Sequence, residues 1–403
     1  MEQPRSNAAL EGIRVLDLTG PLGNYAAKLM ADFGADVIKV EPVGGDAFRS
    51  QGPMPATARY RDAGLPFILN NLNKRSVTVD LESAAGQMLF RRMAKQADVV
   101  LETAEPGWMD SRGIGYAALA ALNPGIIYTA ITPFGQTGPH AHLKASDLTI
   151  QAMGGALALT GDPGGRPVSG GIRVAEKMAG YTAATATAFA IHYRMGGGGG
   201  QFIDVSAQEA VISQMEMSTT RYIFTGAIQQ RNGWRVAVVT CPAGLYPCID
   251  GEVSIVASKI HQWSALRDWI GDERLMKDEY LMEPARFADR DYIDPIVIEW
   301  TRTMKKADVF HGGQRRGIPI GECLRPGELV RDIHMLNRGY IAKMDDPRIG
   351  SIQVPGAPYQ MSGTPWRIRR PAPFPGEHNG ELLDELGIDN AEAAALRESG
   401  VVG

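Results

Sequence analysis

The chain has 403 residues, of which 44% are hydrophobic and 21% charged, and its formal net charge is −4. This length and composition predict a globular protein with two or three domains, or one large domain with an insertion. The small acidic charge argues against nucleic acid or an anionic membrane surface as a partner, and no apolar run is long enough to span a bilayer.

Strands and helices alternate in the first 130 residues. The expected strands are short apolar runs at 13–18, 35–41, 76–81, 97–102 and 125–132, and the expected helices are 25–33, 82–96 and 116–122. This alternation predicts right-handed βαβ units and a parallel sheet, so the core is expected to be a doubly wound α/β domain. The first turn, GPLGNY, lacks the GxGxxG spacing of a dinucleotide site, which disfavours nicotinamide and flavin cofactors.

The middle of the chain has a different pattern of expected secondary structure from its start. After expected helices at 176–194 and 207–224, a hairpin at 246–256 and three further helices predict a smaller α+β domain. The Pro-rich stretch that follows has little core of its own and is expected to lie on another surface, in the same subunit or in a partner. The expected domains are 1–225, 226–326 and a tail, 327–403, that returns to the large domain.

Two places carry residues suited to chemistry. Lys74 and Arg75 precede an expected strand and suit a phosphate, although solvated charges at a sheet edge are an equally good interpretation. Glu176 begins a helix directly after a glycine- and proline-rich loop. A carboxylate among the N–H groups of a helix start is a candidate catalytic group, but acids in the first turn of a helix are also common for dipole reasons alone.

Metal and redox chemistry are not expected. No His, Glu or Cys cluster has the spacing of a metal site, so we predict no metal. Cys241, Cys248 and Cys323 fit reduced thiols of a cytoplasmic protein, which is the expected location.

Several sequence blocks occur in a familiar order along nearly the whole chain. They include GIRVLDLT, GADVIKVEPVGGD, NLNKRSVTVDL, ITPFGQTGP, DLTIQAMGGALALTGDPGGRPV and VPGAPYQMSGTPWRIRRPAPFPGEHNGELLDELG. These blocks resemble family III CoA-transferases (the CaiB/BaiF family). The resemblance implies a Rossmann-like large domain built from both chain ends, a smaller α+β domain, and two subunits interlocked like links of a chain. It also implies transfer of coenzyme A between carboxylic acids, with a CoA thioester as substrate and no permanently bound cofactor.

The resemblance also assigns roles to particular residues. The family's nucleophilic aspartate lies in a stretch like GVxxADxxAG, which here reads GIRVAEKMAG, so Glu176 takes its place. The resemblance implies CoA binding by Asn73, Lys74, Arg75 and Lys144, and a substrate or oxyanion loop at Gly135 and Gln136. Two CoA-holding residues of the family, Asn and Phe, are replaced by Thr103 and Ala104.

Three functions remain open at this point. The first is an active CoA-transferase with Glu176 as nucleophile. The second is a non-catalytic subunit that pairs with an aspartate-bearing paralogue in a heterodimer or heterotetramer, as in enzymes that activate benzylsuccinate with succinyl-CoA, which would imply an aromatic acid as acceptor. The third, an acyl-CoA racemase, is disfavoured because Ser146 stands where those enzymes carry His before the acid aligned with Asp147.

Overall fold

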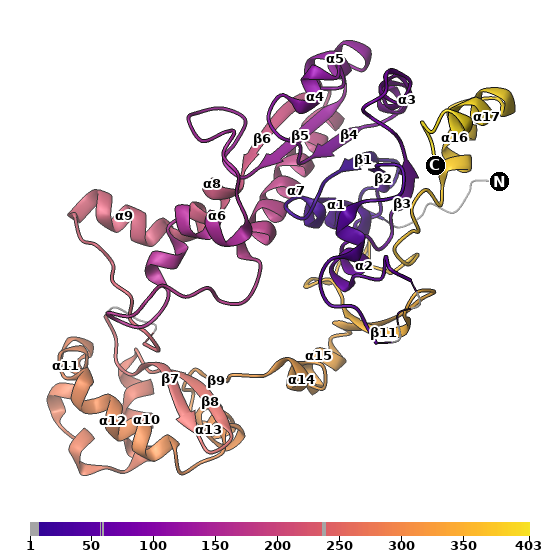
Figure 1. The fold of residues 1–403 in the computed structure, drawn as a ribbon. Helices are drawn as coiled ribbons and strands as arrows, with labels where there is room; N and C mark the ends of the chain where they lie inside the picture. Colours follow the sequence, from indigo (N-terminus) through magenta and orange to yellow (C-terminus); the bar gives the residue numbers. More distant parts are fainter. Residues whose placement is uncertain (1–7, 57, 59, 236–238) are drawn as a thin grey trace. The chain divides into compact units, whose positions relative to one another are not determined.

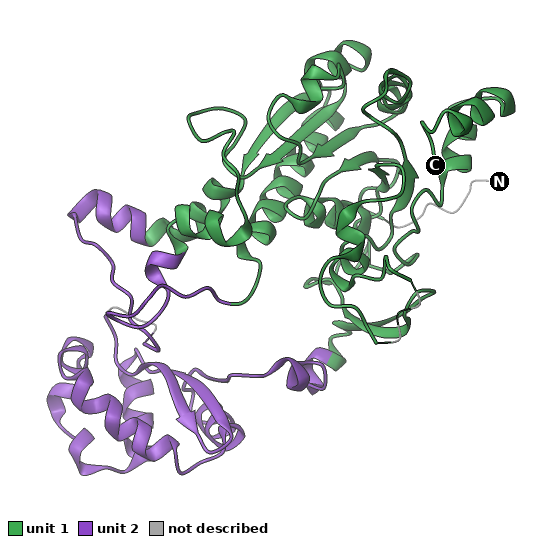
Figure 2. Cartoon of the chain, in the orientation of Figure 1, with its two compact units in different colours: residues 1–156, 171–217, 336–403 green, residues 157–170, 218–335 purple. Residues whose placement is uncertain are grey.

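The computed structural model describes residues 8–56, 58, 60–235 and 239–403. The chain forms two compact units (Figure 2): residues 1–156, 171–217 and 336–403 make the first, and residues 157–170 and 218–335 make the second. Both predicted domain boundaries, at 226 and 326, fall inside the second unit. Segment 157–170, which the prediction left in the large domain, also belongs to the second unit.

A six-stranded parallel sheet forms the centre of the first unit (Figure 1). The strand order is β3-β2-β1-β4-β5-β6. The strands are β1 (Arg14–Leu18), β2 (Asp36–Glu41), β3 (Arg75–Thr78), β4 (Val99–Glu102), β5 (Ile127–Thr132) and β6 (Gln201–Ser206). Strands β2 to β5 are buried along almost their whole length because helices cover both faces of the sheet. The predicted α/β class is therefore confirmed.

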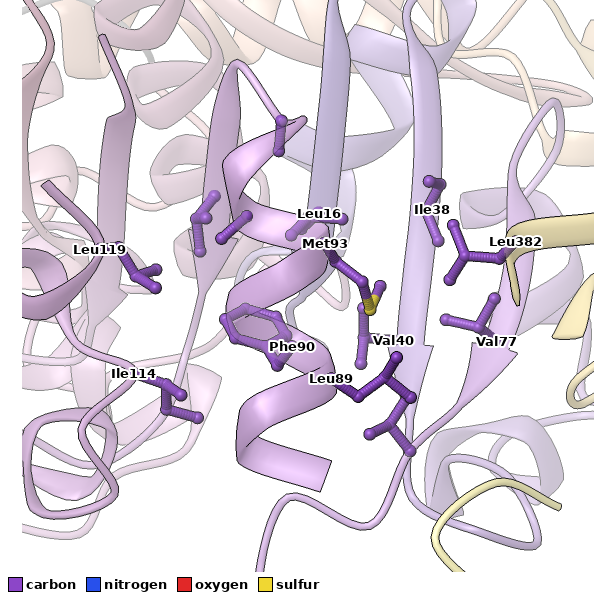
Figure 3. Close-up of a cluster of buried hydrophobic side chains, with 14 of the residues drawn as sticks. Leu16, Ile38, Val40, Val77, Leu89, Phe90, Met93, Ile114, Leu119 and Leu382 are labelled. Carbon is purple, nitrogen blue, oxygen red and sulfur yellow. The ribbon is translucent and has the colours of Figure 1, made fainter. Parts of the chain in front are cut away.

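Adjacent residues of each strand enter opposite cores because strand side chains alternate between faces. On one face, Leu16 and Ile38 pack against Phe90 and Met93 of α3 (Figure 3). On the other face, Val15 packs with the helices α1 and α7. Helices of the first face are α3 (Ala84–Lys95), α4 (Trp108–Ser111) and α5 (Tyr116–Leu122), and those of the second are α1 (Asn24–Asp32), α6 (Asp147–Met153), α7 (Val174–Met195) and α8 (Ala207–Ile212).

The C-terminal part of the chain completes the edge of the sheet beside β3. Its helices are α16 (Asn379–Glu385) and α17 (Asn390–Glu398). The buried side chain of Asn379 accepts the N–H of Thr78 at 2.9 Å and donates to the Thr78 hydroxyl at 2.9 Å. It also donates to the carbonyl of Gly403. The return of the tail to the large unit therefore depends on matched polar contacts as well as on apolar packing.

Two local predictions were incomplete. The stretch expected to be extended contains a hairpin of β10 (Ile341–Asp346) and β11 (Gly350–Pro355), whose Met344 and Val354 pack with Phe67 of α2 (Leu65–Asn70). The single helix expected at 207–224 is broken into α8, a 3-10 turn at Ser213–Met215, and α9 (Glu216–Thr225).

The second unit has its own core. Strands β7 (Ala243–Cys248), β8 (Gly251–Val256) and β9 (Ile320–Glu322) form an antiparallel sheet, and buried Trp263 and Tyr280 lie in the core with it. The helices are α10 (Ile260–Ile270), α11 (Glu283–Ala288), α12 (Arg290–Thr301), α13 (Lys306–Gln314), α14 (Pro326–Leu329) and α15 (Ile333–Asn337), the last of which runs on into the first unit. Among the described residues of the whole chain, no helix has both the length and the apolar character needed to cross a membrane.

Replacing Asn379 by Ala should destabilise the protein by about 1–3 kcal/mol, because it leaves the buried N–H of Thr78 without an acceptor. Chemical denaturation with the midpoint and slope fitted separately would measure the loss. Lys95→Ala, on the exposed face of α3, is the control and should change stability by less than about 0.5 kcal/mol. Equal midpoints for the two variants would show that the tail is held by apolar packing alone.

Candidate active site

A cavity of about 660 Å³ opens at the carboxyl ends of the parallel strands. In a doubly wound sheet the loops after β1 and β4 turn to opposite sides, which leaves a crevice between them where ligands bind. The lining follows this rule: Leu18 ends β1, Glu41 ends β2, and Thr103 and Ala104 follow β4. The topology alone therefore provides a ligand-sized space at this edge.

The loop after β1 packs tightly against the loop after β4. The N–H of Gly20 donates to the Thr103 hydroxyl at 2.7 Å. A Cβ atom on Gly23 would lie 2.7 Å from Thr19 and 2.8 Å from Thr103, closer than real contacts allow. Thr103, which replaces the Asn of the family pattern, thus accepts a hydrogen bond from the loop after β1.

Lys74, predicted to bind CoA, is fully buried in an ion pair. Its Nζ lies 2.7 Å from Asp17 Oδ2 and 2.9 Å from Asn71 Oδ1. The other oxygen of Asp17 accepts the N–H and the hydroxyl of Thr19, and Lys39 Nζ donates to the Thr19 carbonyl at 2.9 Å. Lys74 therefore has a structural role in this network, and a phosphate would reach it only if the network opened.

The charged groups of this network shift the pKa values of one another. Burial by itself would raise the pKa of Asp17, but the neighbouring Lys74 and Lys39 lower it below its ordinary value. Burial lowers the pKa of Lys74 to about 8, although Asp17 opposes the change. The contact of 2.7 Å with Asp17 makes Lys74 the counter-ion of that carboxylate.

Asn73 and Arg75 are also occupied. Asn73 Nδ2 donates to Asp32 at 3.0 Å, and its backbone has a left-handed φ of 66°. Arg75 is buried and pairs with Asp36 at 2.6 Å and Glu385 at 2.7 Å. The contacts of Arg75 join β3 to β2 and to α16, and that of Asn73 reaches α1. Binding of CoA by these two residues stays a prediction.

Lys144 is the exposed member of the four predicted CoA-binding residues. Its side chain is 80% exposed and pairs with the carboxylate of Glu105, which lines the cavity. The ion pair also lowers the pKa of Glu105. Lys144 therefore remains a candidate for contact with an anionic ligand.

Glu176 is held by contacts on both sides. Its side chain, 16% exposed, pairs with Arg173 at 3.0 Å, and its backbone N–H donates to Asp147 Oδ1 at 3.0 Å. Burial raises the pKa of Glu176, and Asp147 adds to this effect while Arg173 opposes it. The carboxylate is thus partly desolvated, oriented by a cation and of raised proton affinity.

Close packing of α7 on α1 brings Glu176 to the edge of the sheet where the cavity opens. A Cβ on Gly180 would lie 2.8 Å from Tyr25, so the two helices touch at their starts. The ammonium of Lys177 lies 3.9 Å from the Tyr25 ring centre, and burial lowers the pKa of Lys177 to about 8. Because α1 follows β1 directly, the start of α7 lies at the carboxyl edge of the sheet (Figure 1).

The predicted oxyanion loop differs from expectation. Gly135 has a φ of 85°, and the N–H of the next residue, Gln136, already donates to both oxygens of Asp204 at 3.1 and 3.0 Å. That N–H is therefore not free for an oxyanion. The side-chain Nε2 of Gln136 is buried, and within the described part of the chain it has no hydrogen-bond partner.

Glu102 is a buried carboxylate at the same edge of the sheet that the sequence pattern did not single out. It ends β4 and lines a small cavity of about 40 Å³ together with Gln136, Tyr128 and Asp110. Burial raises the pKa of Glu102 to about 7, although the N–H of Ala104 donates to its carboxylate. The signal was present in VVLE, an apolar run that ends in a carboxylate at the functional edge of a parallel sheet.

For the described residues, no group of three or more His, Cys, Asp or Glu side chains is arranged to hold a metal ion.

Lys74→Met should destabilise the protein by about 3–5 kcal/mol, because Asp17 would become an unpaired buried charge. Adding Asp17→Asn to that variant should recover part of the loss. Lys144→Met removes an exposed cation and should change stability by less than about 0.5 kcal/mol. Thermal and urea unfolding of the four proteins provide the test, and a Lys74→Met protein as stable as Lys144→Met would contradict the structural role.

Comparison with known proteins identifies relatives of this chain. The sequence model of "CoA-transferase family III" matches residues 10–379. Succinyl-CoA–D-citramalate CoA-transferase of Chloroflexus aurantiacus is 32% identical over 407 residues and covers all of both chains. Subunit BbsE of succinyl-CoA:(R)-benzylsuccinate CoA-transferase from Thauera aromatica is 33% identical, with 96% of this chain and 97% of that protein aligned.

A solved structure agrees with these sequence matches. The crystal structure of a CaiB/BaiF family protein from Brucella suis superimposes with a TM-score of 0.84 at 29% identity, over 94% of this chain and all of that one. The sequence match and the shared fold both extend over nearly the whole chain. The chain therefore belongs to CoA-transferase family III, the CaiB/BaiF family.

Proposed function

We propose that this chain is a CoA-transferase subunit that moves coenzyme A from succinyl-CoA, or a similar dicarboxylic thioester, to another carboxylic acid, with Glu176 as the attacking carboxylate. The observation that carries the proposal is the state of Glu176. It is partly desolvated, has a raised pKa and is paired with Arg173. The two succinyl-CoA-dependent relatives support the donor.

The chemistry needs only a carboxylate and the two substrates. Glu176 attacks the thioester carbonyl and the C–S bond breaks. The CoA thiolate departs, and the donor acyl group is now joined to Glu176 as a mixed anhydride. The thiolate then attacks the Glu176 carbonyl of this anhydride, which releases the donor acid and forms a glutamyl-CoA thioester. The acceptor carboxylate and the thiolate repeat these two steps in reverse order, so the acceptor leaves as its CoA thioester and Glu176 is regenerated.

Surrounding residues suit this role. Burial removes water from Glu176, which favours attack and protects an anhydride from hydrolysis. Arg173 holds the carboxylate in one orientation, and Lys177 adds positive charge close to it. Because Glu is one methylene longer than the family Asp, the bound acyl group must lie correspondingly farther from the start of α7.

A non-catalytic subunit is the second candidate, favoured by the lining of the 660 Å³ cavity. The lining residues include Glu41, Asp80, Glu82 and Glu105, and none of those described is Lys or Arg. Such a surface suits the phosphates of CoA poorly. The relative from Thauera aromatica is itself named as one subunit of an enzyme, which supports a paralogous, aspartate-bearing partner and makes aromatic acids worth testing as acceptors.

A second chain is proposed in either case. On α7, Phe189 is 71% exposed, Tyr193 is 61% exposed and Met195 is 77% exposed. Phe189 also lines an apolar cavity of about 440 Å³, together with Phe33 and Tyr359. An exposed apolar surface of this kind is typical of a subunit interface and supports the interlocked dimer, formed with a copy of this chain or with a paralogue.

Glu176→Gln should abolish trapping of an acyl-enzyme by hydroxylamine and lower turnover at least about a thousandfold, because the nucleophile is lost. Glu176→Asp is the control, since it keeps the carboxylate and should retain measurable trapping. Turnover of the unchanged protein should rise with pH through the raised pKa of Glu176, because only the ionised form attacks. Mass spectrometry of trapped peptides and pH–rate profiles with succinyl-CoA would measure these effects.

The same variant separates the two candidates. If this chain is non-catalytic, it should be inactive alone and active only with its paralogue. Glu176→Gln in this chain should then leave the turnover of the complex within a few-fold of its original value. That outcome would contradict the nucleophilic role of Glu176.

The purified chain should have at least twice the mass of one chain in solution, and Phe189→Glu should shift it toward the monomer by placing a charge in the interface. Met88→Glu is the matched control, because Met88 is 61% exposed on α3, a helix of the other sheet face. Light scattering after size-exclusion chromatography would measure both. A monomeric unchanged chain at micromolar concentration would refute the self-associating form of the proposal.

A further inference from the structure

The carboxylates that line the 660 Å³ cavity are not all neutralised in the same way. Glu41 is buried and pairs with buried Arg49 at 2.5 Å, so its charge is balanced inside the protein. Glu82 and Glu105 are different, because their side chains are 65% and 72% exposed at the mouth of the cavity. These two acids therefore face any ligand that enters.

Each exposed acid pairs with one cation, and these two cations beside the lining acids, Arg112 and Lys144, are called the rim of the cavity. Arg112 Nη2 lies 2.5 Å from Glu82, and its guanidinium stacks 3.9 Å from the ring centre of Trp108, another lining residue. Lys144, which is almost fully exposed, pairs with Glu105. The rim thus contains two cations, and both are engaged by carboxylates of the same chain.

Coenzyme A carries a diphosphate and a 3′-phosphate, which are the groups that free Arg and Lys side chains at a rim would bind. A phosphate that approaches Arg112 or Lys144 competes with Glu82 or Glu105 for the N–H groups of these cations. The displaced carboxylate stays nearby and repels the phosphate. Exposed pairs of this kind are weak, so the acids compete with a phosphate without blocking it completely.

We propose that Glu82 and Glu105 are specificity-determining residues that compete with the phosphates of coenzyme A for Arg112 and Lys144, and so weaken CoA binding by this chain. The proposal rests on the proposed function in one respect, that CoA is the ligand of this cavity. It concerns binding alone and does not depend on whether Glu176 is a nucleophile. The chain is then a family member whose own CoA affinity is restrained at two named positions.

Isothermal titration of free CoA into the full-length protein tests the proposal. Glu82→Gln and Glu105→Gln keep the size of each side chain and remove its charge, so each should tighten CoA binding about two- to fivefold, and the double variant should bind more tightly than either. Adding Arg112→Ala to Glu82→Gln should reverse the gain of that variant. Pantetheine, which lacks all phosphates of CoA, should bind the unchanged protein and the variants equally.

Glu392→Gln is the matched control. Glu392 forms a similar exposed pair with Arg92 at 2.5 Å but does not line the cavity, so its substitution should leave CoA affinity unchanged. Equal CoA affinity in the unchanged protein and the double variant would overturn the proposal, as would an equal gain from Glu392→Gln. The absence of CoA binding in every variant would also overturn it. Failure of the proposed function appears separately, as the absence of a Glu176 adduct and of turnover.

Discussion

The buried ion pair of Asp17 and Lys74 is the interaction on which the functional edge of the sheet depends. Asp17 belongs to β1 and Lys74 precedes β3, so the pair spans β2, the strand between them. Through Thr19 the same network holds the start of the loop after β1, which packs against the loop after β4 at the cavity. Because an unpaired charge in this position is strongly destabilising, loss of either partner is expected to weaken the whole edge.

Carboxylates at this one edge are placed in contrasting environments. Two adjacent cations lower the pKa of Asp17, whereas burial raises the pKa of Glu102 to about 7 and also raises that of Glu176. Groups of the same chemical type thereby acquire different tasks, since a permanently ionised acid suits structure and one of raised proton affinity suits chemistry. Neighbouring charge and solvent exclusion, rather than residue type, separate these roles.

The sequence was informative where the determinants are local. Short apolar runs that alternate with helices predicted the parallel sheet, and the loop–helix junction predicted the position of Glu176 at the start of α7. The roles of Lys74 and Arg75 were not predictable, because their counter-ions Asp17 and Asp36 belong to other strands. The β10–β11 hairpin was missed for a related reason, since its core partners lie in α2, far away in the chain.

The closure of β3 by the chain end has a consequence for the order of events during synthesis. Thr78 is made early, but its partners Asn379 and Gly403 are made 301 and 325 residues later. The second unit draws most of its residues from one continuous segment, 218–335, and can fold before then. The first unit therefore completes the edge of its sheet only after the whole second unit has been synthesised.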